Sequence, residues 1–178
     1  MNIQFDSYAI SSLDTSNPKA FFDIINNNRS RLEDFFAGTV SRTMTLKDTE
    51  DYCKVIEQRI VDKSYFPFSI TEILTNSYVG FIDVKNIDWN IPKAELGYFI
   101  DSHYEGKRIV SKALGYVIDY LNATYNIRKL LCRVASQNAG SIAVALKNGF
   151  QLEGTIRCDY KTTKGEIVDL NYYGRIFA

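Results

Sequence analysis

The segment from His103 to Val110 holds the residues of this chain that are best placed to bind an anion. It joins a strand-like run, Ala94 to Ile100, to a helix pattern that begins at Val110. A glycine turn between a strand and a helix directs unpaired backbone N–H groups and the positive end of the helix dipole to one place. Lys107 and Arg108 stand where the helix begins, so two cations could add to those amides around a pyrophosphate. The same residues also fit a simpler alternative, a solvated turn with the glycine as a hinge.

A second polar junction contains Asn138 and Ser141. Asn138 follows a run typical of a buried strand, Leu130 to Val134, and is a good N-cap for the helix after it. Gly149 supplies the left-handed residue that ends this helix. The junction predicts a β-α-β passage. Asn138 and Ser141 could serve chemistry there, or they could only cap the helix and fill its first turn, which is their usual role.

These junctions require a sheet with helices packed against it. The long helix is predicted by apolar residues that recur at i, i+3, i+4, i+7, i+8 and i+11 from Val110 to Leu121. Short runs rich in aromatic and β-branched residues, broken by turn residues, predict an antiparallel meander before it. We expect strands at Ile3 to Ala9, Phe66 to Leu74, Tyr78 to Val84, Ala94 to Ile100, Lys129 to Ala135, Phe150 to Tyr160 and Glu166 to Phe177, and helices from Asn17, at Asp48 to Lys63, at Val110 to Leu121 and at Ala139 to Asn148.

This order predicts a mixed α/β fold with a mostly antiparallel central sheet of about seven strands and about four helices. No internal repeat, low-complexity tract or linker interrupts the chain. With 178 residues, we expect residues 1–178 to form a single domain with a substantial core.

Composition narrows the class of function. Lys plus Arg and Asp plus Glu number 21 each, and no block of one sign suggests a nucleic-acid surface. No apolar run approaches the 18 or so residues that span a bilayer, and the polar start lacks the regions of a signal peptide. We expect a soluble, cytoplasmic protein that binds neither nucleic acid nor membrane.

Cysteine and histidine usage points away from metal and nucleophilic catalysis. Cys53, Cys132 and Cys158 are scattered and include no C-x-x-C pair, which favours ordinary reduced thiols over a disulfide framework or a zinc site. His103 is the single histidine, so a histidine-based triad or a multi-histidine metal site would have to depend on this residue alone. We expect no metal cofactor.

Several runs of the chain follow one another in a characteristic order. They are Tyr65 to Ile70, Val79 to Ile82, Glu95 to Ile100, Tyr104 to Val110, Asn138-x-x-Ser141, Leu146 to Phe150 and Leu152 to Arg157. Each run is weak evidence, but together they resemble the GNAT acetyltransferases, and more closely the ribosomal-protein N-terminal acetyltransferase branch (RimJ/RimL-like). The resemblance covers most of the chain and implies a GNAT-like sheet in which two central strands part.

The resemblance also implies acetyl-CoA as co-substrate. In this family the pyrophosphate sits on the amides of an Arg/Gln-x-x-Gly-x-Gly/Ala turn, which corresponds to His103 through Arg108. Here His103 replaces the first polar residue and Arg108 replaces a small one. Asn138 resembles the residue that bonds the pantetheine amides, and Ser141 the residue near the cofactor sulfur. The cofactor-binding residues implied are Phe99, Ile100, Glu105, Gly106, Lys107, Arg108, Ile109, Val110, Asn138 and Ser141.

Direct acetyl transfer to a primary amine needs a base for the amine and an acid for the departing thiolate. For the acid we choose Ser141, with Tyr160 as the second choice. For the base the candidates are Asp159 and Glu95, a choice that the sequence leaves open. His103 has a suitable unperturbed pKa, but its place in the phosphate turn makes it the weaker candidate.

The acceptor is the least determined part of the prediction. The branch includes enzymes that acetylate the N-terminal amine of ribosomal proteins, so a protein N-terminus is the expected partner and a small-molecule amine the alternative. A different class, a non-catalytic acyl-CoA-binding or regulatory module, is favoured by the irregular phosphate turn. The sequence does not decide whether two copies of the chain form a homodimer.

Overall fold

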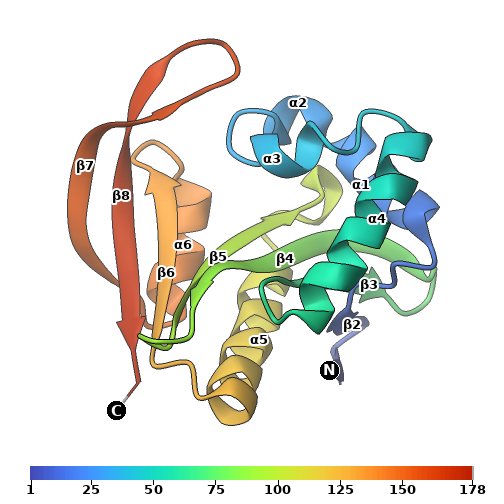
Figure 1. Cartoon of the computed structure of the whole chain (residues 1–178), viewed down its shortest axis with the longest axis horizontal. Coiled ribbons are helices and arrows are strands. Elements are labelled where there is room, and N and C mark those ends of the chain that lie inside the picture. The colour runs from blue at the N-terminus through green and yellow to red at the C-terminus, as the bar shows by residue number, and fades with distance from the viewer. Residues whose placement is uncertain (178) are drawn as a thin grey trace.

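The computed structural model describes residues 1–177 and contains one eight-stranded sheet (Figure 1). Neighbouring strands follow the order β1-β2-β3-β4-β5-β6-β8-β7, and every neighbouring pair is antiparallel except β5 and β6. The strands are β1 (Asn2–Phe5), β2 (Tyr8–Ser12), β3 (Phe66–Glu72), β4 (Ser77–Asp88), β5 (Lys93–Ile100), β6 (Lys129–Ala135), β7 (Gln151–Lys161) and β8 (Ile167–Ile176). The predicted meander of β3, β4 and β5 is confirmed.

Helices cover both faces of the sheet. They are α1 (Pro18–Asn27), α2 (Arg29–Leu32), α3 (Ala37–Val40), α4 (Leu46–Val61), α5 (Ile109–Tyr125) and α6 (Ala139–Lys147), with a 3-10 turn at Ser102–Tyr104. One buried cluster joins α5 and α6 to Leu96 and Tyr98 of β5, and a second joins α1 and α4 to Phe99. Successive side chains of a strand point to opposite faces, so β5 separates the two clusters.

The start of the chain differs from the prediction. A single strand was expected from Ile3 to Ala9, but the chain turns at Asp6, where φ is 48°, and forms the β1–β2 hairpin. A left-handed residue suits a two-residue hairpin turn, and Asp tolerates that conformation better than most residues. The sheet therefore has eight strands rather than about seven.

Local sequence signals account for most helix ends. Asn17 accepts a hydrogen bond from the amide of Ala20 at the start of α1, and Thr45 forms a capping box with Asp48 at the start of α4. The α4 helix therefore begins two residues earlier than the predicted Asp48. The two short helices α2 and α3 carry too few residues to show a periodic pattern, and they were not predicted.

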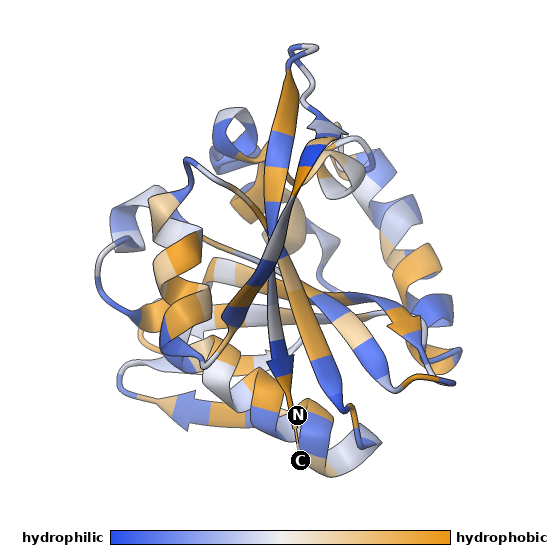
Figure 2. Cartoon of the chain, turned by 90° about the vertical axis from the view of Figure 1, so that its left-hand side faces the viewer, coloured by the Kyte–Doolittle hydropathy of each residue, from blue (hydrophilic) through white to orange (hydrophobic). Residues whose placement is uncertain are grey.

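The β7–β8 hairpin stands at the edge of the sheet. Figure 2 looks onto this side and shows hydrophobic and hydrophilic residues alternating along the strands. Nearly all of β7 is exposed, whereas Leu170 and Tyr173 of β8 are buried. Among residues 1–177, no helix is both long enough and apolar enough to span a membrane.

Candidate active site

A cleft of about 850 Å³ lies where β5 and β6 part. The two strands pair over only three positions, from Lys93 with Lys129 to Glu95 with Leu131. Beyond Glu95, β5 stays bonded to β4 on one side, and on its other side alternate backbone groups face the gap. The predicted parting of two central strands is therefore confirmed. It leaves backbone donors and acceptors free inside a cleft.

The predicted phosphate turn forms one end of this cleft. Gly106 has φ of 73° and Arg108 has φ of 62°, so the chain enters α5 through two left-handed residues. No side chain caps the amino end of α5, unlike α4 and α6, which are capped by Thr45 and Asn138. The first N–H groups of α5 are therefore available to an anion.

The six residues from Glu105 to Val110 divide between the cleft and the rest of the protein. Glu105, Gly106, Arg108 and Val110 line the cleft, as does Ile100. Lys107 turns toward Tyr104, with its ammonium 4.9 Å from the ring centroid, and Ile109 is buried in the core beneath α5. These two residues can contribute backbone N–H groups but not side chains.

An unpredicted cation, Arg31, reaches this turn from α2. It forms an ion pair with Glu105, and its Nη1 donates to the side chain of Asn28 at 3.0 Å and to the carbonyl of Ile100 at 3.4 Å. Arg31 also lines the cleft. Since Arg31 and Glu105 are 74 positions apart, no local pattern in the sequence could have paired them.

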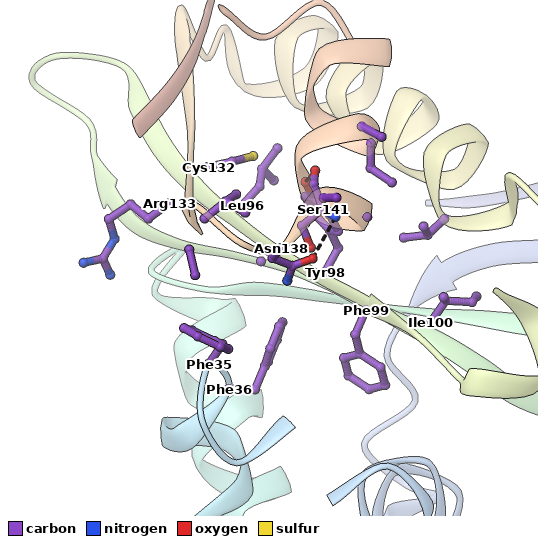
Figure 3. A pocket seen from close by; sticks show the side chains of 18 of the residues that line it. Phe35, Phe36, Leu96, Tyr98, Phe99, Ile100, Cys132, Arg133, Asn138 and Ser141 are labelled. Atoms are coloured by element: carbon purple, nitrogen blue, oxygen red, sulfur yellow. Dashed lines mark hydrogen bonds between the residues drawn. The ribbon is translucent and has the colours of Figure 1, made fainter. Parts of the chain in front are cut away.

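Asn138 and Ser141 lie together on the opposite wall, at the start of α6 (Figure 3). Asn138 Oδ1 accepts from the amide of Ser141 at 3.0 Å, so the expected N-cap is confirmed and the amide group of Asn138 remains free. The hydroxyl of Tyr98 donates to the backbone carbonyl of Ser141 at 2.7 Å. This bond links β5 to α6 across the gap and leaves the hydroxyl of Ser141 unengaged by Tyr98.

The two candidate bases have different surroundings. Glu95 lines the cleft, accepts from Asn86 at 2.9 Å and lies 3.1 Å from Nε of Arg133. Asp159 instead accepts from the hydroxyl of Tyr172 at 2.8 Å and is not among the residues that line the cleft, although its neighbour Tyr160 is. Burial raises the pKa of Tyr172, and the hydrogen bond to Asp159 raises it further, against the effect of Arg133. Of the two candidates, Glu95 lines the cleft and Asp159 does not.

A buried carboxylate supports the wall behind Gly97. Asp83 is 3% exposed, and it accepts from the hydroxyl of Tyr65 at 3.2 Å and from Nζ of Lys85 at 3.3 Å. A Cβ at Gly97 would collide with this carboxylate and lie 2.9 Å from Nζ of Lys85. Burial, together with Asp83, raises the pKa of Tyr65 well above its ordinary value. Gly97 therefore makes room for a charged pair beside the cleft.

Aromatic rings form the wall below β5, where Figure 3 shows Phe35, Phe36 and Phe99. Phe36 packs edge-on against Phe99, and Phe35 stacks on Tyr160 of β7. Burial raises the pKa of Tyr160, and Asp34 adds to the rise. Of these residues, Phe99 and Tyr160 are among the candidates named from the sequence, whereas Phe35 and Phe36 are not.

Two further residues with reactive side chains, His103 and Cys132, are poorly suited to act in the cleft. The ring of His103 is exposed and sits 2.8 Å from Asp101, which holds the 3-10 turn. Cys132 lines the cleft, but burial raises the pKa of its thiol far above the usual range. Residues 1–177 contain no group of three or more His, Cys, Asp or Glu that could hold a metal ion.

Comparison with known proteins places this geometry among acetyl-transferring enzymes. Residues 14–151 match the family described as acetyltransferase (GNAT) domain. A ribosomal-protein-serine acetyltransferase of Escherichia coli (strain K12) is 25% identical over 177 residues, which is 96% of this chain and 93% of that protein.

Two solved structures share the fold closely. A ribosomal-protein alanine acetyltransferase from Vibrio fischeri superposes with a TM-score of 0.90 at 18% identity, covering 99% of this chain and 96% of that one. The ribosomal alpha-N-protein acetyltransferase RimL, solved in complex with coenzyme A, also gives 0.90, at 21% identity and with 99% and 98% coverage. Both likenesses extend over the whole sheet and its helices.

Proposed function

Because this chain belongs to the GNAT acetyltransferase domain family and is an acetyl-CoA-dependent N-acetyltransferase, we propose that the cleft between β5 and β6 is its acetyl-CoA site. The turn at Gly106 and Arg108, with the first amides of α5, would bind the diphosphate. The uncapped amino end of α5 inside the cleft carries this assignment, because those N–H groups have no side-chain partner.

The parted strands suit the pantetheine arm. Free backbone groups of β5 beside Phe99 and Ile100 would pair with its amides as a short strand does, and a backbone N–H there would stabilise the oxyanion formed during attack. The free amide of Asn138 would bond the same arm from the opposite wall. Lys107 and Ile109 would contribute through their backbone N–H groups.

Ser141 is our proposed acid and Glu95 our proposed base. The amine nitrogen attacks the thioester carbonyl, the carbon–sulfur bond breaks, and Ser141 passes a proton to the departing sulfur. Glu95 takes the amine proton through a water, because it is the candidate carboxylate that lines the cleft. Asp159 is the alternative base, and its position beyond Tyr172 would require a longer path.

The acceptor that we propose is the N-terminal amine of a protein, of the ribosomal class on which the similar Escherichia coli enzyme is named to act. A chain terminus is a slender primary amine and suits a cleft whose far side is bordered by side chains of α2 and β7. A cytoplasmic location follows from a ribosomal-protein acceptor. A small-molecule amine is the outcome that would replace this proposal.

We also propose that residues 1–178 make one domain and that two copies associate. The edge strand β7 presents unpaired backbone groups, with Leu152 and Ile156 exposed on it. Sedimentation equilibrium measures this directly, and a monomer at high concentration would contradict it.

Alanine at Ser141 tests the catalytic assignment. Ser141→Ala should lower kcat by more than tenfold while it changes acetyl-CoA affinity little, because the hydroxyl is needed only when the sulfur departs. Equal losses in turnover and affinity would contradict the acid role.

Glu95→Gln and Asp159→Asn form the matched pair of variants that tests the base, since each removes one negative charge at constant size. The true base is the one whose loss abolishes the rise of kcat/KM with pH.

A further inference from the structure

Three consecutive residues between α2 and α3 span the cleft. Asp34 accepts from the hydroxyl of Thr163 at 2.8 Å and lies 3.6 Å from Nζ of Lys164, both at the tip of the β7–β8 hairpin. The hydrogen bond from Thr163 lowers the pKa of Asp34, and Lys164 adds to that effect. In Figure 1 this hairpin tip bends toward α2 and α3.

The next two residues contact two further strands. The ring of Phe35 stacks on Tyr160 of β7, with centroids 5.7 Å apart and planes 24° from parallel. The ring of Phe36 packs edge-on against Phe99 of β5 at 5.4 Å. We call Asp34, Phe35 and Phe36 the bridge. It joins the two sides of the cleft through side chains rather than through the sheet.

The bridge lies on the face of the sheet opposite to α5 and α6, the helices that begin at the proposed acetyl-CoA site. Tyr98 points toward α6 and Ser141, whereas Phe99, its neighbour, points toward the bridge. An acetyl group held near Ser141 would therefore meet an amine that arrives from the side of the bridge. This step rests on the proposed function, in which the acceptor is an N-terminal amine.

Three ion pairs lie around the bridge. Asp34 pairs with Lys164, Asp83 with Lys85, and Glu95 with Arg133. An acceptor with a second ammonium or a carboxylate beside its amine would thus displace an existing pair to find a partner, and it would lose hydration on entering the cleft. The charges favour an uncharged neighbour for the reactive amine.

The uncharged surface at this position is aromatic. Phe35 is 40% exposed although it is a large apolar side chain, and both it and Tyr160 line the cleft. We propose that Phe35 and Tyr160 are specificity-determining residues that bind a large apolar side chain next to the reactive amine. The acceptor class is then a protein N-terminus whose first residue is Met, Leu or Phe, rather than a small, acidic or basic residue.

Peptides that differ only in their first residue test this assignment. Thiol release from acetyl-CoA is followed with peptides that begin with Met, Phe, Ser, Asp or Lys, and with spermidine as a polycation. We expect kcat/KM to be about tenfold or more higher for Met and Phe than for Ser, because an apolar pocket gains roughly that factor from added apolar groups. Asp, Lys and spermidine should be the poorest acceptors.

Variants of the aromatic pair locate the selection. Phe35→Ala should remove most of the preference for Met over Ser and leave the KM for acetyl-CoA unchanged, whereas Tyr160→Phe, which keeps the ring, should retain the preference. Val61→Ala, at a residue of α4 that is 75% exposed, is the control and should match the wild type. Should Phe35→Ala fail to fold, the preference of Phe35→Leu and the kcat/KM values of the wild type for the different peptides still test the inference.

The outcomes separate this inference from the function on which it rests. A wild-type profile that is flat or that favours Ser, or a Phe35→Ala enzyme with the wild-type preference, overturns the inference while leaving the N-terminal acceptor intact. Acetylation of spermidine with no peptide acetylated overturns both, because the acceptor is then not a chain terminus.

Discussion

Replacing Arg108 with glycine acts on stability and on cofactor binding in opposite directions. Arg108 is the N-cap of α5 and has φ of 62° and ψ of 12°, a left-handed conformation. Its side chain is exposed at the mouth of the cleft, beside the amides proposed to bind the diphosphate. Glycine relieves the backbone and deletes the guanidinium in one change.

The magnitudes follow from the conformation. A non-glycine residue in the left-handed region costs about 1–2 kcal/mol of stability, which glycine avoids. Glycine also increases the entropy of the unfolded chain, and this offsets about 0.4–1 kcal/mol of the gain. We therefore expect Arg108→Gly to raise the free energy of unfolding by about 0.5–1 kcal/mol, which is roughly 1–4 °C in Tm for a chain of this size. If the guanidinium binds the diphosphate, as we propose, its loss should weaken acetyl-CoA binding by about 1 kcal/mol, or roughly fivefold.

Arg108→Ala is the matched variant, because it deletes the guanidinium but keeps a Cβ in the left-handed conformation. Thermal melts of the free proteins should show stabilisation by glycine and none by alanine. Titration calorimetry with acetyl-CoA should show the same loss of affinity for both variants, since the charge is absent from each.

Two results would refute this reasoning. If both variants bind acetyl-CoA more tightly than the wild type, the guanidinium obstructs the diphosphate rather than binding it. If alanine stabilises the protein as much as glycine does, the left-handed backbone at Arg108 is not the source of the strain.

Three further predictions concern the surrounding residues. Tyr98→Phe deletes the bond to the Ser141 carbonyl and should cost about 1 kcal/mol of stability; it should also lower kcat more than it raises the KM for acetyl-CoA, and a change in KM alone would contradict the positioning of α6. Burial raises the pKa of Asp101, but hydrogen bonds from Asn28 and His103 outweigh burial, and the net effect lowers the pKa. The Asp101 carboxylate therefore stabilises the fold fully above its ordinary pKa near 3.8, and that contribution disappears as pH falls through the lowered value. Urea melts between about pH 2 and 6 should therefore show a shallower acid loss for Asp101→Asn than for the wild type. Cys158 is exposed and should react quickly with a thiol reagent, whereas burial, with Glu57 and Asp14, raises the pKa of Cys53 to about 11; equal rates, measured by mass spectrometry of the labelled protein, would contradict the burial.

Much of the fold could be predicted because its signals are local. The helix α5 shows its apolar face at a spacing of three and four residues, and α6 carries a cap at Asn138 and a left-handed glycine at Gly149 with φ of 77°. The β1–β2 hairpin was missed because its turn, at Asp6 and Ser7, lacks the glycine that usually marks one. The helices α2 and α3, of four residues each, are too short for any period to show.

The candidate site divides in the same way. The residues Gly106, Asn138 and Ser141 were accessible from the sequence because each stands at a strand-to-helix junction that the pattern predicts. The choice between Glu95 and Asp159 was not, because it depends on which strand borders the gap and on the positions of Arg133 and Tyr172.

By itself, the sequence determined the elements, the two polar junctions and the resemblance to an acetyl-CoA-dependent family, since spacing, caps and turns act over a few neighbouring residues. Only the tertiary structure decided that Arg31 reaches Glu105 and that the bridge contacts the β7–β8 hairpin. Asp34 and Thr163 are 129 positions apart, and such a pair comes together only when the strand order of the whole sheet places one above the other. The side of the cleft that we propose for the acceptor is built from contacts of this long-range kind.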